Sequence, residues 1–257
     1  MNQSALLTIF ASSASAASAN LYETLFASLG ATGVVTDGLL SDWLQSSGGS
    51  PAGNGDVLGY MPDISGSGNH LEQTTGANKP TVTVTNGIPA ATAGNNKEIG
   101  ASITFTGTSE FSWVGVCYGP NNTTPLEWFI FQGGSLDFLQ FHDPNDWLTF
   151  AYDGIDKGHF ALSALRGGPM ILRVVYKASA VFIYAYDMAG SLVASTGTGL
   201  FPATANFDGP YTLFFSVLAP QGSGEIAFSL VADKAITGDN WTAVLADLVS
   251  RYGGWHA

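Results

Sequence analysis

A succession of short apolar runs, each bounded by turn residues, is the feature that most constrains how this chain folds. From Thr81 onward the runs are rich in β-branched and aromatic residues, and Gly, Pro, Asn and Asp separate them at short intervals. Thr81 to Thr85 alternates polar and apolar residues and is followed by Asn86-Gly87, a strong hairpin signal. A parallel α/β fold would need helices between the strands, and no helical pattern occurs there. The sequence therefore predicts an all-β fold, an antiparallel β-sandwich.

The expected strands after this first hairpin are all short. They cover residues 102–107, 111–119, 127–134, 136–143, 147–154, 170–176, 181–190, 211–219 and 224–233. Residues 177–180, between two of them, are predicted to form a second hairpin turn. The run at 127–132 is apolar on both alternating faces, which favours either a fully buried strand or a sheet face covered by a partner.

Length and cysteine content indicate a single core without staples. All-β sandwiches often run to roughly 200–250 residues as one domain, and this chain has 257. A chain of this size buries about three quarters of its unfolded surface, so it needs no disulfide or structural metal. The single cysteine, Cys117, lies in an apolar run with no basic neighbour, and we expect a buried, inert thiol there.

The charge balance excludes two classes of partner. The chain has 8 Lys and Arg against 20 Asp and Glu, a net charge of −12, and no Lys or Arg precedes Lys79. Nucleic-acid binding draws most of its affinity from basic side chains that neutralise phosphates, so no nucleic acid is expected as a partner. An anionic membrane surface would repel the chain for the same reason, and no apolar run is long enough to span a bilayer.

The first 36 residues differ in composition from the rest of the chain. An apolar segment followed by Ser- and Ala-rich sequence resembles a secretory signal, but no Lys or Arg precedes the apolar segment. We expect residues 1–36 to form an N-terminal arm fixed by a neighbouring subunit, and residues 37–257 to form the sandwich. The alternative is a strand and helix packed on their own domain. Asn20 to Gly30 has helix-capping residues at both ends and predicts a short helix.

Two further segments flank the predicted sandwich. Gly238 to Tyr252 has apolar residues at helical spacing and ends at Gly253-Gly254, which predicts a short C-terminal helix. Residues 39–45 fit a helical face or an opening strand, and the strand is preferred because a turn motif follows at the expected distance.

The turn motif lies between Tyr60 and Thr81. Its characteristic residues are Asp63, Ser65, Gly66, Gly68, Asn69, Gln73, Lys79 and Pro80. The pattern resembles that of the laminin-G-like, concanavalin A-like jelly-roll domains found in phage virion proteins. The ending resembles the same family, through Gly224 to Ala227 and the helix that follows. The likeness covers roughly residues 40–257, with Gln45 in place of the usual acid and a generic middle.

The resemblance implies a function by assembly. It implies a non-enzymatic virion structural protein of a bacteriophage, either a capsid decoration protein or a tail or fibre component. Its partners would be other virion proteins and further copies of itself in a homo-oligomer, and its location would be the virion. Residues 1–36 and one apolar sheet face would be buried against neighbouring subunits.

The densest acidic region offers the one candidate metal site. Asp143, Asn145 and Asp146 carry oxygen ligands of the kind that Ca²⁺ takes from flexible loops. The same residues are ordinary turn formers, and the spacing is not that of a calcium loop. Ca²⁺ is therefore the single cofactor that the sequence leaves open. The four histidines are scattered without metal-ligand spacing, and His70 in the turn motif is expected to be structural.

Aromatic residues in the central strands give the alternative function. Trp147 and Tyr152 could stack on sugars, which would make the chain a carbohydrate-binding, lectin-like adhesin module that recognises a host glycan. A secreted glycosidase is a third reading, but none of the six glutamates alternates with an aspartate on one strand. No catalytic residue is therefore assigned, and the sequence predicts that the protein is not an enzyme.

Overall fold

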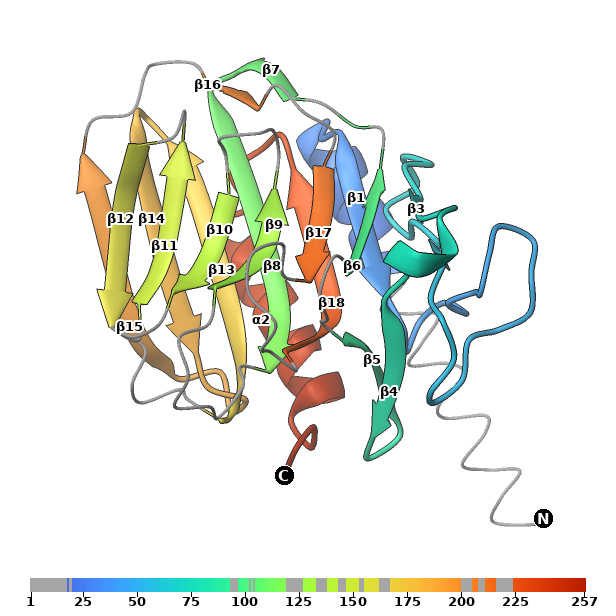
Figure 1. The fold of residues 1–257 in the computed structure, drawn as a ribbon. Helices are drawn as coiled ribbons and strands as arrows, with labels where there is room; N and C mark the ends of the chain where they lie inside the picture. Colours follow the sequence, from blue (N-terminus) through green and yellow to red (C-terminus); the bar gives the residue numbers. More distant parts are fainter. Residues whose placement is uncertain are drawn as a thin grey trace, which may run out of the picture.

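The computed structural model shows two antiparallel β-sheets stacked face to face, with a helix against the outer surface of one of them (Figure 1). It describes residues 18, 20–92, 97–101, 103, 105–118, 127–132, 138–142, 147–152, 155–161, 167–199, 205–207, 211–215 and 224–257. Every strand pairing in this part of the chain is antiparallel. The predicted all-β sandwich is confirmed.

The first sheet has the strand order β15-β14-β13-β8-β18-β5-β4, and β1 also pairs with β18. Its strands are β1 (Gly33–Asp37), β4 (Thr81–Thr85), β5 (Ile88–Thr92), β8 (Glu110–Tyr118), β13 (Pro169–Lys177), β14 (Ala180–Tyr186), β15 (Leu192–Gly199) and β18 (Glu225–Ala232). The non-consecutive neighbours show that the chain crosses repeatedly between the two layers.

The second sheet has the order β12-β11-β10-β9-β17-β6-β3-β2. Its strands are β2 (Tyr60–Met61), β3 (Leu71–Glu72), β6 (Lys97–Ala101), β9 (Glu127–Gln132), β10 (Phe138–His142), β11 (Trp147–Tyr152), β12 (Ile155–Ala161) and β17 (Tyr211–Phe215). A small separate ladder joins β7 (Phe105–Thr108) to β16 (Ala205–Phe207), and η1 (Gly76–Asn78) is a single 3-10 turn. The two short strands β3 and β2 end this sheet, and they carry the candidate site.

Two apolar cores stabilise the sandwich. The first lies between the sheets and includes Trp113, Val174 and Leu213. The second lies between the outer face of the first sheet and the two helices, residues 20–29 and α2 (Gly238–Tyr252). All eight residues of β18 are buried, because the second sheet covers one of its faces and the helices cover the other. The helices therefore explain why strands of this sheet are apolar on both faces.

The described part of residues 1–36 packs on the sandwich. Tyr22, Leu25 and Phe26 are buried in the second core, and Gly33 to Asp37 pairs with β18. This packing matches the alternative of a helix and strand on their own domain, and the expected boundary after residue 36 falls inside β1. Residues 1–17 and 19 lie outside the described residues.

The strand expected at residues 39–45 is wrong. Gly38 to Leu40 forms a turn, and Leu44 makes only isolated bridges, to Pro51 and Tyr60. Trp43 nevertheless contributes its buried side chain to the core between the sheets. The apolar residues in this segment are therefore buried from a loop, which periodicity cannot distinguish from a strand.

Both predicted hairpins and the C-terminal helix are present. Asn86 and Gly87 have positive φ and join β4 to β5, and Ala178 and Ser179 have positive φ and join β13 to β14. The helix α2 begins at Gly238 and ends at Tyr252, as predicted. No helix among the residues that the structure describes is long and apolar enough to cross a membrane.

A buried ion network holds the two helices and β1 together. The Arg251 guanidinium of α2 pairs with the carboxylates of Asp37 in β1 and Asp247 in α2, and its Nη2 donates to the Tyr22 hydroxyl at 2.9 Å. Burial alone would lower the pKa of Arg251, but the Asp37 carboxylate and the other partners outweigh burial, so the pKa is raised above its ordinary value. Arg251 is therefore held in its charged form.

Candidate functional site

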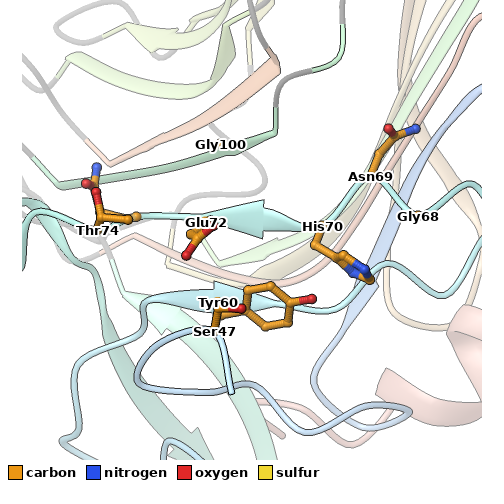
Figure 2. Close-up of a pocket in the computed structure, with 9 residues that line it drawn as sticks. Ser47, Tyr60, Gly68, Asn69, His70, Glu72, Thr74 and Gly100 are labelled. Atoms are coloured by element: carbon orange, nitrogen blue, oxygen red, sulfur yellow. The ribbon is translucent and has the colours of Figure 1, made fainter. Parts of the chain in front are cut away.

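A cavity of about 530 Å³ opens where β2, β3 and β6 end the second sheet, and we call it the Tyr60 cavity. Its lining residues are Ser47, Tyr60, Gly68, Asn69, His70, Glu72, Gln73, Thr74 and Gly100 (Figure 2). The volume falls in the range of roughly 300–1,000 Å³ that is usual for small-molecule sites. Nearly all of the lining side chains carry hydrogen-bonding groups, and Tyr60 also provides a phenol ring.

Strand register places the floor of the Tyr60 cavity on the outer face of the sheet. Tyr60 of β2 lies opposite Glu72 of β3, and Glu72 lies opposite Gly100 of β6. Met61 and Leu71 are fully buried between the sheets. Because alternate residues of a strand face opposite sides, Tyr60 and Glu72 face outward. Gly100 has no side chain, and a Cβ there would meet Thr212 Oγ1 at 2.9 Å, so β6 and β17 approach closely at this position.

The Asp63 turn builds one wall of the cavity. The Asp63 carboxylate accepts backbone N–H bonds from Val35, Ser65 and Asn69, each at 2.9 Å. It also accepts the Ser65 hydroxyl at 3.0 Å. Asn69 is fixed from its other end, since its Nδ2 donates to the Gly33 carbonyl at 2.8 Å. The Ile64 backbone N–H also donates to the Val35 carbonyl at 2.9 Å. The turn is thus tied to β1 through three hydrogen bonds, which hold Asn69 at the edge of the cavity.

Two glycines allow this turn to close. Gly66 and Gly68 have φ of +82° and +74°, which is the left-handed region that side chains disfavour. A Cβ on Gly68 would meet no atom within 4 Å, so conformation alone requires glycine there.

His70 is both part of the turn and part of the cavity. Its Nδ1 accepts the backbone N–H of Asp63 at 2.9 Å, which identifies the neutral ring with its proton on Nε2. The His70 ring centroid lies 5.2 Å from that of Tyr60, with the planes 36° apart. Figure 2 shows the two rings next to each other. The structural role expected for His70 is confirmed, and the ring also lines the cavity.

The carboxylate of Glu72 is exposed and makes no hydrogen bond or ion pair with any residue that the structure describes. Desolvation, together with the nearby carboxylates of Glu72 and Asp63, raises the pKa of Tyr60. Tyr60 is therefore a neutral phenol at physiological pH, and Glu72 is available to a ligand.

Gln73, by contrast, is held in place. Its Nε2 donates to the Glu98 carboxylate at 3.2 Å, and its Oε1 accepts the Thr75 backbone N–H at 2.9 Å. The neighbouring lysines are also occupied, since Lys79 donates to the Gln45 carbonyl at 2.6 Å and Lys97 to the Ala77 carbonyl at 2.7 Å. No Lys or Arg lines the described cavity.

The chemistry available in the Tyr60 cavity is that of recognition. An aromatic ring can cover the apolar face of a ligand, while the carboxylate, amide, hydroxyl and imidazole groups exchange hydrogen bonds with it. A metal centre is not indicated, because the described residues contain no group of three or more His, Cys, Asp or Glu side chains placed to hold an ion.

None of the site residues expected from the sequence is among the described residues that line the Tyr60 cavity. Asp143, Asn145 and Asp146 lie outside the described residues, so the Ca²⁺ site stays a prediction. Trp147 and Tyr152 are the first and last residues of β11, and the structure places them by backbone register only. Five strands separate β11 from β2 in the sheet order. Sugar binding at Trp147 and Tyr152 also stays a prediction.

Sequence reasoning missed the Tyr60 cavity although it singled out the segment that builds it. The turn motif by itself indicates a fold, and its polar residues are those of a turn. A usable signal was present, because Tyr60 directly precedes the motif and His70 and Glu72 lie within it.

The expected inert thiol is confirmed: Cys117 is fully buried, and burial raises its pKa well above the ordinary value.

Comparison with known proteins identifies the fold. No protein-family model matches the chain, and no curated protein sequence matches it. A GH54 α-L-arabinofuranosidase soaked with a cyclic sulfate inhibitor matches with a TM-score of 0.61 at 12% identity, over 89% of this chain and 65% of that chain. The binding domain of Paraclostridial mosquitocidal protein 1 matches with a TM-score of 0.54 at 12% identity, over 72% of this chain and 49% of that chain.

A structure of botulinum neurotoxin type C, described through the dependence of its cell entry on two ganglioside molecules, is similar as well. Its TM-score is 0.54 at 10% identity, over 73% of this chain and 48% of that chain. The chain spans less than two thirds of the length of each of these three solved chains. At such low identity the likeness shows fold alone, and the fold is a jelly-roll-like β-sandwich.

Proposed function

We propose that this protein is a carbohydrate-binding module that holds a sugar in the Tyr60 cavity. The observation that carries the proposal is the Tyr60 ring, half-buried on the cavity floor and surrounded by hydrogen-bonding side chains. A sugar ring has an apolar C–H face and a rim of hydroxyl groups, so it needs an aromatic surface and polar partners together. The cavity supplies both in one place.

The similar structures support the same class of ligand. One is an arabinofuranosidase, and another is described through ganglioside binding, so proteins with this fold include ones that take glycans. This support comes from the fold and not from shared residues. The virion structural role implied by the resemblance to phage proteins stays a prediction, as do its assembly partners and location.

We propose binding without turnover. Glycoside hydrolysis ordinarily requires two carboxyl groups on either side of the scissile bond, one as acid and one as base or nucleophile. Glu72 is the only carboxylate among the described residues that line the Tyr60 cavity. A single carboxylate can accept hydrogen bonds from sugar hydroxyls but does not form that pair.

The proposal is tested by replacing the ring. Tyr60→Ala removes the stacking surface and is expected to weaken binding roughly tenfold on a glycan array of neutral oligosaccharides, while Tyr60→Phe keeps most of the affinity. The matched control is Phe182→Ala, which removes an exposed ring from β14 in the other sheet. If Tyr60→Ala and the control bind glycans equally well, the Tyr60 cavity is not the binding site.

A further inference from the structure

The charged groups in and around the Tyr60 cavity select among the sugars that could bind there. This inference rests on the proposed function, sugar binding in that cavity. Glu72 places a carboxylate beside the Tyr60 ring, and no described residue bonds to it. Glu98 places a second carboxylate at the margin, bonded to the lining residue Gln73. Lys79 and Lys97 keep their positive charge while they donate to backbone carbonyls, but neither lines the cavity. Among the described lining residues, Glu72 is therefore the one that carries a full charge.

The whole molecule reinforces this local charge. A net charge of −12 produces a negative potential around the protein, and a concave surface between low-dielectric walls concentrates it. An acidic sugar would bring its carboxylate against Glu72, where like charges repel. A sugar that carries an ammonium group would gain at the same position.

We infer that the Tyr60 cavity takes an amino sugar with a free, protonated amine. The ammonium group would pair with the Glu72 carboxylate, and the C–H face of the same ring would lie on Tyr60. The two groups are on neighbouring strands in directly opposed positions, where Cβ atoms lie about 4.5–5.5 Å apart, so one pyranose ring reaches both. The aromatic ring adds a cation–π attraction to the same charge.

The other polar groups of the cavity suit the rest of such a ligand. His70 presents its Nε2 proton as a donor, because its Nδ1 is already an acceptor for the Asp63 backbone. Asn69 offers its amide oxygen as an acceptor, since its Nδ2 donates to Gly33 and no described residue donates to that oxygen. Sugar hydroxyl groups donate and accept, so they match a cavity that offers both kinds of partner.

The test compares three soluble oligosaccharides by isothermal titration calorimetry at low salt: a β-1,4-linked glucosamine trimer, the N-acetylglucosamine trimer and sialyllactose. We expect the glucosamine trimer to bind wild-type protein about threefold to tenfold more tightly than its N-acetylated counterpart, which lacks the charge. Glu72→Gln should bring the ratio of the two affinities to about one, because the amide carries no charge to attract the ammonium groups. Asp239→Asn is the matched control, since it makes the same change in net charge at an exposed position on α2.

The outcomes separate this inference from the proposed function. Equal binding of the two trimers, with loss of both in Tyr60→Ala, overturns the amine preference and leaves sugar binding in place. Tighter binding of sialyllactose also overturns the preference. An amine preference that survives in Glu72→Gln places the charge recognition elsewhere and overturns the inference. If no oligosaccharide binds at any concentration, on the array or in solution, the proposed function fails and the inference fails with it. Circular dichroism of each variant verifies that it is folded.

Discussion

At the scale of single residues, Asp63 decides the shape of the Tyr60 cavity. Its two carboxylate oxygens accept three backbone N–H groups and one hydroxyl, from residues in β1 and in the turn itself. Hydrogen bonds to an ionised carboxylate are stronger than those between neutral groups. If the Asp63 carboxylate is removed, the backbone N–H groups that donate to it lose their acceptor, and leaving them unsatisfied costs free energy. Asp63 could be predicted from the sequence as a turn residue, but its bond to Val35 could not, since 28 positions separate the two.

Asp63→Ala is expected to lower the free energy of unfolding by roughly 2–4 kcal/mol, because it leaves several N–H groups without an acceptor. Asp63→Asn, which keeps one acceptor oxygen, should cost less. Urea denaturation followed by tryptophan fluorescence measures both. Glycan binding should fall in Asp63→Ala as well, since Asn69 and His70 lose their common anchor. An unchanged denaturation midpoint in Asp63→Ala would show that the turn does not depend on this carboxylate.

At the scale of elements, the two hairpins show how far local chemistry predicts structure. Asn86-Gly87 is the preferred pair for a two-residue turn with positive φ at both positions, and the structure has φ of +52° and +80° there. Ala178 and Ser179 adopt the same conformation, at +53° and +62°, without either preferred residue. The second turn is therefore imposed by the long β13–β14 pairing, which continues through seven residue pairs.

This imposed conformation predicts a stabilising substitution. An L-residue in the left-handed region costs about 1–2 kcal/mol, so Ala178→Asn with Ser179→Gly should raise the free energy of unfolding by about 1 kcal/mol after the unfolded-state entropy of glycine is deducted. Gly87→Ser is the reciprocal control and should lower the free energy of unfolding by a similar amount, because a side chain disfavours the φ of +80° at this position. No atom lies within 4 Å of the added Cβ, so a steric clash does not add to this cost. Thermal unfolding by calorimetry compares the variants. A destabilised double variant would contradict the assignment of strain to this turn.

The N-terminal elements show where local patterns were insufficient. The helix at residues 20–29 was predicted from its capping residues, and its left-handed end at Gly30 has φ of +58°. The destination of that helix was not predictable. Tyr22 packs its ring 5.4 Å from Phe228 of β18, a contact between residues that are far apart in the sequence. At residues 39–45 the predicted element itself was wrong, since the apolar residues there are buried from a loop and not from a strand.

At the scale of the whole molecule, the Arg251 network joins the first described elements to the last. Asp247 accepts the Tyr22 hydroxyl at 2.7 Å and the Ser18 hydroxyl at 2.5 Å, in addition to Arg251. Burial would raise the pKa of Asp247, but hydrogen bonds and charge from Arg251 lower it below its ordinary value. The folded protein therefore keeps Asp247 ionised at a pH where the unfolded chain binds a proton.

The sign of the resulting pH dependence follows from this difference. The stabilisation by Asp247 is complete above its unfolded pKa of about 3.9, and it is lost as the pH falls through the lower folded pKa. In Asp247→Asn, the slope of unfolding free energy against pH below about pH 5 should be shallower than in wild type, by at most about 1.4 kcal/mol per pH unit, the value for one proton. Urea titrations between pH 2 and pH 7 measure the slope. An unchanged slope in Asp247→Asn would show that Asp247 does not contribute to the acid transition.

The sequence by itself determined the fold class, most strands, both hairpins and the C-terminal helix, because strand alternation, turn residues and helix caps are properties of neighbours in the chain. Only the tertiary structure decided which polar residues meet. The Tyr60 cavity depends on the register of three strands, which sets Tyr60 opposite Glu72 and Glu72 opposite Gly100. Register is fixed by burial of Met61 and Leu71 between the sheets and by the Asp63 turn bound to β1, and these contacts join segments that no local pattern connects.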